Sequence, residues 1–226
     1  MTEPANDLIL LQHGDSFFPS GAVSFSWGLE TLTEDGRVQS ADSVSEFLVN
    51  QIRYRWATND RAALAAAHGA GADLVAVVSI DRLVEAQMLA SELRDGSRRT
   101  GRALLSMHDK LETPLARMFL DRVRAGHTPG HAAVVQGLVW RGVGLTLSQA
   151  ERLSAHTLCI GFLGAALRLG IIGHVDAQRI LRVAQDAIVD IVRQMAPPIN
   201  EMSAFTPEAE IAAMRHETAE TRLFAN

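Results

Sequence analysis

The sequence predicts an all-α protein, a single helical bundle of about eight to ten helices followed by a partly flexible C-terminal tail. Apolar residues recur at three- and four-residue spacing along most of the chain, and strand-like alternation of apolar and polar residues is not found. Alanine and leucine are abundant while aromatic residues make up only 5% of the chain, a composition that favours helices. A chain of 226 residues is long enough for one sizeable core.

The chain opens with an unusual stretch, DSFFPSGAVSFSWGLE, over residues 15–30. Pro19 fixes its own φ and disfavours helix at the residue before it, and Gly21 can adopt a positive φ, so the stretch predicts a turn pinned into the core. Ser26 and Glu30 are polar within this apolar sequence. They require hydrogen-bond partners either within the fold or on the surface of another protein.

The remaining elements follow from apolar spacing and from start and stop signals. We expect an apolar run at 8–11 that packs under the opening turn, and helices that begin at capping boxes at 43–46 and 148–151. A helix is expected over 75–93 with its acidic residues on a solvated face, followed by a break at 95–97 and a helix over 97–107. Further helices are expected to begin at Thr113, Thr128 and Thr206, each of which precedes a proline, and at Asp176 as a capping residue. Pro197 and Pro198 end the bundle, which predicts a helical domain over 1–196 and a tail over 197–226.

Composition excludes several function classes. Cys159 is the single cysteine, so one chain can form neither a disulfide nor a cysteine-based zinc site, and we expect this residue in the core. Only Lys110 is a lysine and no glycine-rich loop precedes it, which argues against a P-loop nucleotide site. A net charge of −5 argues against a general nucleic-acid binder. Neither a secretory signal nor a membrane span is evident, so a cytoplasmic location is expected.

Four stretches match, in order, the motifs of one protein family. The matching residues are Pro19, Gly21, Ser26, Gly28, Leu29 and Glu30 in the first; Ser97, Arg98, Gly101, Arg102 and Leu104 in the second; Ala166, Arg168, Leu169, Gly173 and Gln178 in the third; and Arg215, His216, Glu217, Thr218, Arg222, Leu223 and Phe224 in the fourth. On these motifs the chain resembles the urease accessory protein F family along nearly its whole length. It departs from the pattern at Ile171, His174 and Thr221, where the family usually has proline, glutamine and serine.

The resemblance implies a non-enzymatic, all-α homodimer without a cofactor or a metal site of its own. Proteins of this family bridge the D/H accessory protein and the nickel-carrying GTPase G, modulate the GTPase and help to insert nickel into apo-urease. Their C-terminal segment becomes ordered on the D/H protein. The residues implied by position are Ser26, Glu30, Arg168 and Gly173 on the GTPase side; Arg215, His216, Glu217, Arg222, Leu223 and Phe224 on the D/H side; and Pro19, Gly21, Gly28, Arg98, Gly101 and Arg102 as structural motif residues.

Plainer interpretations stand beside these roles. Arg168 could act as an arginine finger, but an interface arginine or a helix C-terminal arginine is the simpler interpretation. Glu30 is interpreted as a structural or interface carboxylate rather than a catalytic one. His127 and His131 have the spacing of helical metal ligands, but the proline and glycine between them favour a loop. Arg98 and Arg102 could meet an acidic partner or form ordinary intramolecular ion pairs.

Two other functions compete with the accessory role. A dimeric helical transcriptional regulator would need a basic recognition helix, and the best candidate, residues 97–105, contains neither Asn nor Gln to read bases. A small helical metalloenzyme would need a ligand set that the scattered histidines do not offer. Neither alternative explains the ordered motif matches.

Overall fold

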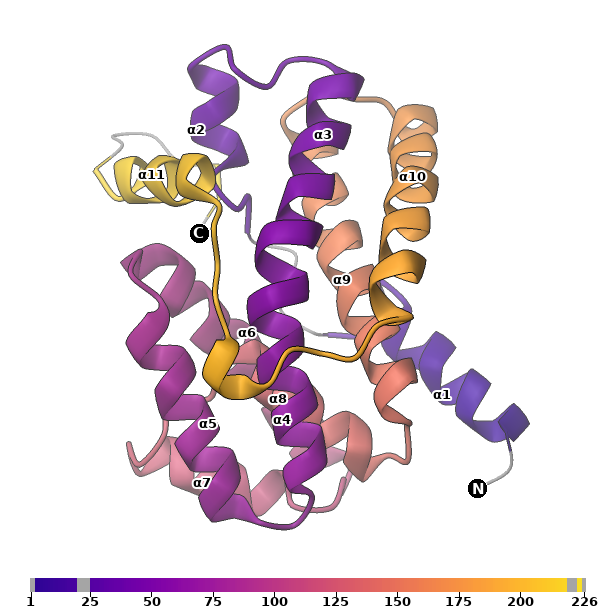
Figure 1. Ribbon diagram of the computed structural model, residues 1–226, viewed down its shortest axis with the longest axis vertical. Coiled ribbons are helices and arrows are strands. Elements are labelled where there is room, and N and C mark those ends of the chain that lie inside the picture. The colour runs from indigo at the N-terminus through magenta and orange to yellow at the C-terminus, as the bar shows by residue number, and fades with distance from the viewer. Residues whose placement is uncertain (1–2, 20–24, 219–222, 225–226) are drawn as a thin grey trace.

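A computed structural model describes residues 3–19, 25–218 and 223–224. All regular secondary structure within these residues is helical, which confirms the all-α bundle (Figure 1). In chain order the helices are α1 (Glu3–Gly14), α2 (Leu29–Glu34), α3 (Ala41–Gln51), the π-helix η2 (Ile52–Asp60), α4 (Arg61–Ala70), α5 (Leu74–Gln87), α6 (Ser91–Lys110), α7 (Ala116–Arg124), α8 (Ala132–Gly142), α9 (Leu147–Arg168), α10 (His174–Val192), the 3-10 turn η3 (Ile199–Glu201) and α11 (Pro207–His216).

The long rod formed by α3, η2 and α4 runs through the middle of the molecule without a break (Figure 1). Helices α9 and α10 pack beside the upper part of this rod, and α8 packs against α4 in the lower part. The α4–α8 contact is close because Gly137 has no side chain. A Cβ atom added there would overlap with the carbonyl oxygen of Leu64. The rod therefore joins the two halves of the bundle.

Two large apolar clusters form most of the core, and a small third one joins Ala90 and Leu93 to Ala213 of α11. One gathers under α4 to α8 around Leu64, Phe119 and Leu138, and the other gathers between the upper rod, α9 and α10 around Leu48 and Phe162. Cys159 belongs to the second cluster, fully buried as expected, and burial raises the pKa of its thiol to about 12.

Several polar side chains buried between the elements are paired. The indole Nε1 of Trp56 donates to Ser154 Oγ at 3.2 Å, and Ser154 donates to Gln136 at 2.9 Å, which ties η2, α9 and α8 together. Arg61 and Glu151 form a buried ion pair at 3.0 Å between α4 and α9. The guanidinium of Arg61 also donates to the carbonyls of Ile191 and Gln194 at the end of α10.

Several helix starts differ from the expected ones. Helix α3 begins at Ala41 because the capping box uses Ser40 and Ser43, not residues 43–46. Helix α9 begins at Leu147 because Thr146 and Gln149 form its box in place of residues 148–151. Each prediction located the right helix but chose a neighbouring set of capping residues, since more than one residue able to cap a helix lies at each place.

Other proline and aspartate signals were also misplaced. Helices α7 and α8 begin after the predicted threonine–proline starts, at Ala116 and Ala132, because Leu115 adopts a positive φ and Thr128 donates to a buried carboxylate. Helix α10 begins at His174 with Gly173 as its N-cap, so Asp176 lies in the first turn instead of capping it. The start of α11 at Pro207, after Thr206, was predicted correctly.

The break between α5 and α6 was predicted in the wrong place. It lies at residues 88–90, which contain neither glycine nor proline, while the expected break at 95–97 lies inside α6. Gly96 serves a packing purpose there, since an added Cβ atom would overlap with the ring of Phe25. The acidic residues expected on a solvated face are instead largely covered: Asp81 and Glu92 are buried and Glu85 is half-buried.

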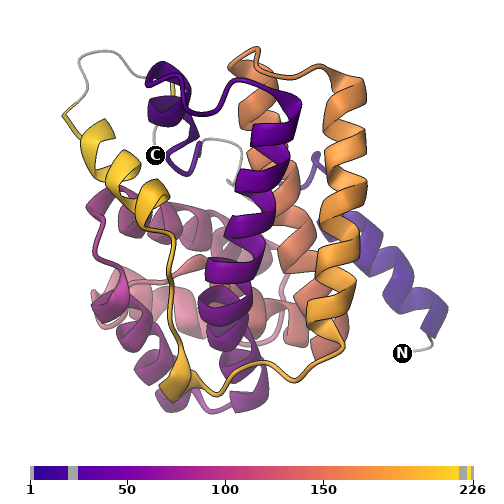
Figure 2. The ribbon, with the colours of Figure 1, turned by 45° about the horizontal axis from the view of Figure 1, so that its top comes forward.

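Within the described part of the opening stretch, one of two neighbouring phenylalanines is pinned in the core. Phe18 is buried and packs its ring against the stacked imidazoles of His13 and His108, whereas Phe17 is 93% exposed. Helix α1 packs on α9 but its N-terminal end projects away from the bundle (Figure 2). Consequently Leu8 and Leu11 are exposed, and the expected burial of the run at 8–11 is correct only for its middle residues.

The chain after α10 returns along the rod as an extended strap, residues 193–206 (Figure 1). The amide of Ser203 donates to Thr58 O at 3.2 Å, the amide of Phe205 donates to Tyr54 O at 2.8 Å, and Thr58 Oγ1 donates back to Ser203 O at 2.6 Å. Both carbonyls belong to the π-helix. The strap delivers α11 to a position against α2 and α6. No helix in the described part of the chain is both long and apolar enough to cross a membrane.

Candidate functional site

The first and last motifs of the chain meet in space. Glu30, the second residue of α2, is only 4% exposed and its carboxylate lies under the C-terminal end of the chain. It accepts hydrogen bonds from the amides of Leu223 at 2.7 Å and Phe224 at 3.2 Å, and it lies 3.0 Å from Nε2 of His216. One buried carboxylate therefore holds both the last residue of α11 and the backbone of Leu223 and Phe224.

His216 is held from its other side by a second carboxylate. Nδ1 of the ring lies 2.9 and 3.0 Å from the two carboxylate oxygens of Glu92, in the first turn of α6. His216 is 1% exposed and Glu92 is 7% exposed. The histidine is thus buried between acidic groups from two helices that are distant in sequence.

Glu217 extends these contacts to the start of α6. Its carboxylate accepts from the hydroxyl of Ser91 and from the amide of Glu92 at 3.3 Å. The hydrogen bond from Ser91 lowers the pKa of this carboxyl below its usual range, against the smaller opposing effect of burial. An ionised side chain here also complements the N-terminal dipole of α6.

Ion pairs border the contact on the solvent side. Arg215 and Asp35 form a bidentate pair, with the second contact at 2.9 Å, and the hydrogen bond from Arg215 holds the pKa of Asp35 below its ordinary value. Arg37 lies 2.7 Å from Glu208 on the same side. These pairs are exposed, so we assign them a role in orienting α11 rather than a large contribution to stability.

Arg168 contacts the C-terminal motif from α9. It is the last residue of α9, and its guanidinium carbon lies 4.5 Å from the ring centroid of Phe224 in a cation–π arrangement. Phe224 is itself buried against the upper core. Glu30 and Arg168, expected together from sequence, thus both contact the C-terminal motif.

Gly28 permits the close approach of α11. Its φ is +81°, in the left-handed region, and an added Cβ atom would lie 2.7 Å from the carbonyl oxygen of Ala209 and 3.1 Å from Cβ of Ala212. A side chain at this position would therefore meet both a backbone penalty and an overlap with α11.

The other residues of these motifs have separate positions. Ser26 is buried two residues before Gly28, and Pro19 is exposed. Gly173 is the exposed N-cap of α10. Gly21 and Arg222 lie outside the described residues.

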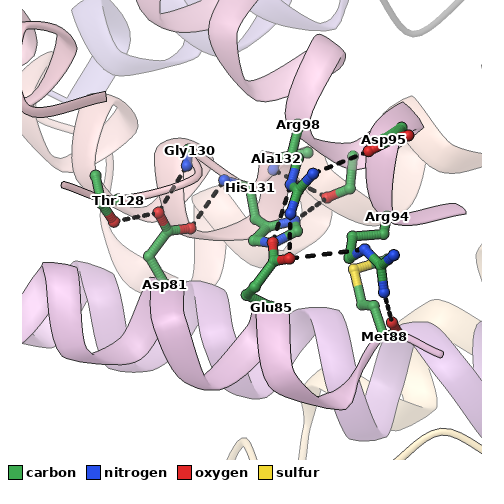
Figure 3. Close-up of polar contacts among 11 residues, drawn as sticks. Asp81, Glu85, Met88, Arg94, Asp95, Arg98, Thr128, Gly130, His131 and Ala132 are labelled. Carbon is green, nitrogen blue, oxygen red and sulfur yellow. Dashed lines mark hydrogen bonds and ion pairs between the residues drawn. The ribbon is translucent and has the colours of Figure 1, made fainter. Parts of the chain in front are cut away.

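The second motif has a structural role between α5, α6 and the start of α8 (Figure 3). Asp81, fully buried on α5, accepts from Thr128 Oγ1 at 2.5 Å and from the amides of Gly130 at 2.7 Å and His131 at 2.8 Å. A carboxylate at these amides satisfies donors that the N-terminal end of a helix leaves unpaired. A side chain at Gly101 would overlap with the carbonyl of Gly130.

Arg98 and His131 complete this cluster through Glu85 (Figure 3). Glu85 pairs with the guanidinium of Arg98 and lies 2.8 Å from Nε2 of His131, whose Nδ1 is 3.1 Å from Ser97 Oγ. Partial burial acts to raise the pKa of Glu85, but its hydrogen bonds with Arg98 and His131 outweigh that effect and lower it; burial lowers the pKa of His131. Arg98 and Arg102 were considered together as possible contacts for an acidic partner. Arg98 takes part in the intramolecular ion pair with Glu85, whereas Arg102 is exposed.

The histidine pair considered as metal ligands does not converge. His131 is buried in the Glu85 cluster, whereas His127 lies exposed in the loop before it. Across the ranges that the structure describes, no group of three or more His, Cys, Asp or Glu side chains is arranged to hold a metal ion.

Sequence reasoning missed the body residues that receive the C-terminal motif. Asp35, Ser91 and Glu92 contact Arg215, Glu217 and His216 respectively, across long sequence separations. No local signal revealed these contacts, because the break before Ser91, which places Glu92 in the first turn of α6, contains neither glycine nor proline. None of the three residues lies in one of the four motifs.

Comparison with known proteins gives a consistent result. A family model described as UreF matches residues 38–185. The chain is 35% identical to the urease accessory protein UreF of Trichodesmium erythraeum, with 98% of this chain and 97% of the relative covered. It is 32% identical to urease accessory protein UreF 1 of Brucella melitensis, over 97% of this chain and 92% of the relative. It is 31% identical to the urease accessory protein UreF of Yersinia pseudotuberculosis, over 98% of this chain and 99% of the relative.

Proposed function

The chain belongs to the UreF family of urease accessory proteins, and from this premise we propose that it is a non-enzymatic adaptor. It bridges the D/H accessory protein and the nickel-carrying GTPase G, helps to deliver nickel to apo-urease and modulates the GTPase. Nickel is the cargo of the assembly. The observation that supports this proposal best is the C-terminal segment (residues 207–218 and 223–224), which is docked by polar contacts and by buried Ala212, Ala213 and Phe224, yet leaves several large apolar side chains exposed.

The outward face of this segment has the composition of a protein-binding surface. Leu223 is 63% exposed, Ile211 57% and Met214 41%, and Phe205 on the strap is 77% exposed. Several large apolar side chains exposed along one segment are typical of an interface, because each would gain by burial against a partner. We assign this face to the D/H protein.

The GTPase side is assigned to the corner formed by α2 and the end of α9. Glu30 is buried under the C-terminal segment, so its contribution is to hold Leu223 and Phe224 in place rather than to touch the GTPase. Arg168 stacks on Phe224, which favours an interface role over that of an arginine finger. Docking of the segment and GTPase recruitment are then linked through shared residues.

We also propose that the adaptor is a cytoplasmic homodimer, as the family resemblance implies. Light scattering on the purified chain tests this state directly. A mass of twice the chain mass of 24.5 kDa is expected, and a monomer at micromolar concentration would remove dimerisation from the proposal.

Co-expression tests the adaptor function. The tagged chain is produced with the D/H protein and the GTPase from the same source, with and without residues 200–226, and the purified assembly is weighed by light scattering. We expect a complex that contains all three proteins and that loses the D/H protein when the segment is removed. Failure of the full-length chain to associate with either partner would contradict the adaptor function.

A further inference from the structure

Helix α1 is held on the bundle at its C-terminal end. Its N-terminal end projects away from the molecule (Figure 2), and the exposed fractions of Leu8 and Leu11 are both 69%. His13, in the last turn, is only 7% exposed, and its ring lies on that of His108 of α6, with centroids 5.1 Å apart and planes inclined by 19°. The ring centroid of Phe18 lies 4.5 Å from that of His13 and 5.8 Å from that of His108. Three aromatic rings therefore join α1, the stretch after it and α6.

The hydrogen bonds of the two histidines leave one nitrogen of each ring without a partner. Nδ1 of His13 lies 2.8 Å from the carbonyl oxygen of Ile9, and since a carbonyl only accepts, Nδ1 carries the hydrogen and Nε2 is a lone pair. Nδ1 of His108 lies 2.9 Å from Oγ1 of Thr113. Nε2 of both rings is buried and has no hydrogen-bond partner among the residues that the structure describes. A proton added to Nε2 of His13 would therefore create a buried N–H donor without an acceptor.

The acidic groups around the rings do not offset a positive charge on them. The charged and titratable side chains next to the cluster lie on α1, the stretch after it, α6, the turn that follows α6, and α9: Asp7, Asp15, Asp109, Lys110, Glu112, Arg152 and His156. The carboxylate of Asp15 accepts from the amide of Phe17 at 2.7 Å, and Asp109 pairs with Arg117 at 2.7 Å. Within the described ranges, no carboxylate is hydrogen-bonded to either ring.

The surroundings of all three histidines at this place favour neutral rings. Burial lowers the pKa of His13, and the hydrogen bond to Ile9 opposes this effect only in part. Burial, with the nearby charge of His13, lowers the pKa of His108 to about 3. Burial also lowers the pKa of His156. A proton on any of these rings is therefore disfavoured while α1 is docked.

We propose that His13 and His108 form a clasp that holds α1 and the stretch up to Phe18 on the bundle only while both rings are neutral. When α1 leaves, His13 enters water, where a histidine side chain binds a proton below about pH 6.5. Opening below that pH takes up a proton, so docking is complete above about pH 6.5 and is lost as the pH falls. Release uncovers the apolar side chains of Ile9 and Leu10, which pack against the lower core.

The clasp does not depend on any partner protein and concerns a different end of the chain from the C-terminal segment. It makes the attachment of α1 responsive to acid, while the rod of α3, η2 and α4 stays folded. A failure of the clasp would leave the adaptor function unaffected, and the absence of partner binding would leave the clasp unaffected.

Amide hydrogen exchange of the full-length chain tests the clasp. The exchange rates of residues 9–14 are divided by the intrinsic rates at each pH from 5 to 7.5, which gives the opening constant of α1. We expect this constant to be flat above about pH 7 and to rise by up to about tenfold per pH unit between pH 6 and 5, as uptake of one proton requires. The amides of α4 and α8 should stay protected throughout. A constant that stays flat down to pH 5, or an α1 that exchanges freely at pH 7.5, would overturn the inference.

A variant separates the titration of His13 from general destabilisation. In His13→Asn the side-chain amide can still donate to the carbonyl of Ile9 but binds no proton, so the opening constant should depend less steeply on pH than in the wild type. His127→Asn, at an exposed histidine, is the matched control and should keep the wild-type slope. A wild-type slope in His13→Asn, or an equal change of slope in both variants, would also overturn the inference.

The ring protons of the wild-type chain give a second measurement that needs no substitution at the clasp. In an NMR titration His13 should show a pKa below 6.5 and below that of the exposed His127, which is identified by its loss in His127→Asn. If His13 instead titrated together with His127, the ring would bind a proton without leaving the bundle and the clasp would be refuted.

Discussion

At the scale of single residues, the docking of the C-terminal segment depends on the absence of a side chain at Gly28. The left-handed φ of +81° and the nearness of Ala209 leave no room for a side chain. Gly28→Ala should lower the free energy of unfolding by about 2 kcal/mol, through backbone strain and the displacement of α11. Chemical denaturation measures the loss, and hydrogen exchange should place it at 207–217.

Gly164 on α9 offers a matched control for this substitution. An added Cβ atom would have no neighbour within 4 Å, so Gly164→Ala should leave stability unchanged or raise it by up to about 1 kcal/mol. If the two substitutions had equal effects, the close approach at Gly28 would not be what matters.

A buried histidine makes stability sensitive to acid. Burial, with a smaller contribution from the nearby charge of His13, lowers the pKa of His108 to about 3, whereas a histidine in the unfolded chain titrates near 6.5. The unfolded state therefore binds the proton first as the pH falls. The contribution of His108 to the free energy of unfolding is fully present above about pH 6.5 and is lost as the pH falls toward 3. At pH 4 this residue alone has lowered the free energy of unfolding by about 3 kcal/mol.

His108→Asn should remove this part of the pH dependence. Between pH 6 and 4 the slope of the unfolding free energy against pH should become shallower by about 1.4 kcal/mol per unit, as measured by urea denaturation at each pH. His174→Asn, at an exposed histidine, should leave the slope unchanged. An unaltered slope in His108→Asn would show that His108 is not neutral in the native state.

Residue roles were predictable from sequence only where a local requirement reveals them. Gly28 lies in a motif, and Cys159 lies in the most apolar helix, so both could be placed. Asp81 and Glu92 could not, because an acidic residue on a helix normally faces water. Their burial depends on donors from Thr128, Gly130, His131 and His216 that only the tertiary structure brings near.

At the scale of elements, the strap and the π-helix η2 are joined by the backbone. Phe205→Pro removes the amide that donates to Tyr54 O at 2.8 Å and should lower stability by about 1 kcal/mol. It should also raise hydrogen exchange in α11, which the strap positions. Phe205→Ala keeps the amide and changes a side chain that is 77% exposed, so it should behave like the wild type. Equal effects of the two variants would assign the contribution to the side chain instead.

The existence and order of the helices were largely predictable, but their ends were not. Capping signals compete where several residues able to cap a helix lie close together, as they do at the starts of α3 and α9. The break at 88–90 has no glycine or proline to reveal it, and it is accompanied by contacts such as the donation from Arg94 to Met88 O at 3.0 Å. Nothing in the local sequence specifies the π-helix either.

At the scale of the whole molecule, the first and last motifs of the chain contribute to one site. The resemblance to the family assigned Glu30 and Arg168 to one partner and residues 215–224 to another, on sequence order alone. The fold brings both sets into contact through Glu30 with Leu223 and Arg168 with Phe224. Sequence could therefore identify most of the participants, whereas their juxtaposition depends on the path of the strap around the rod.

The proposal that the docked segment presents the partner surface is tested most directly by the affinity of the chain for the D/H protein. Leu223→Asp changes a side chain that is 63% exposed and whose amide is the docking group. Calorimetry should show binding weakened by at least about tenfold, because a charge would be buried in an apolar interface. Val75→Asp, on the first turn of α5 and 68% exposed, is the control and should bind like the wild type. Unchanged affinity for Leu223→Asp, or equal losses for both variants, would contradict the assignment of the C-terminal segment as the partner surface.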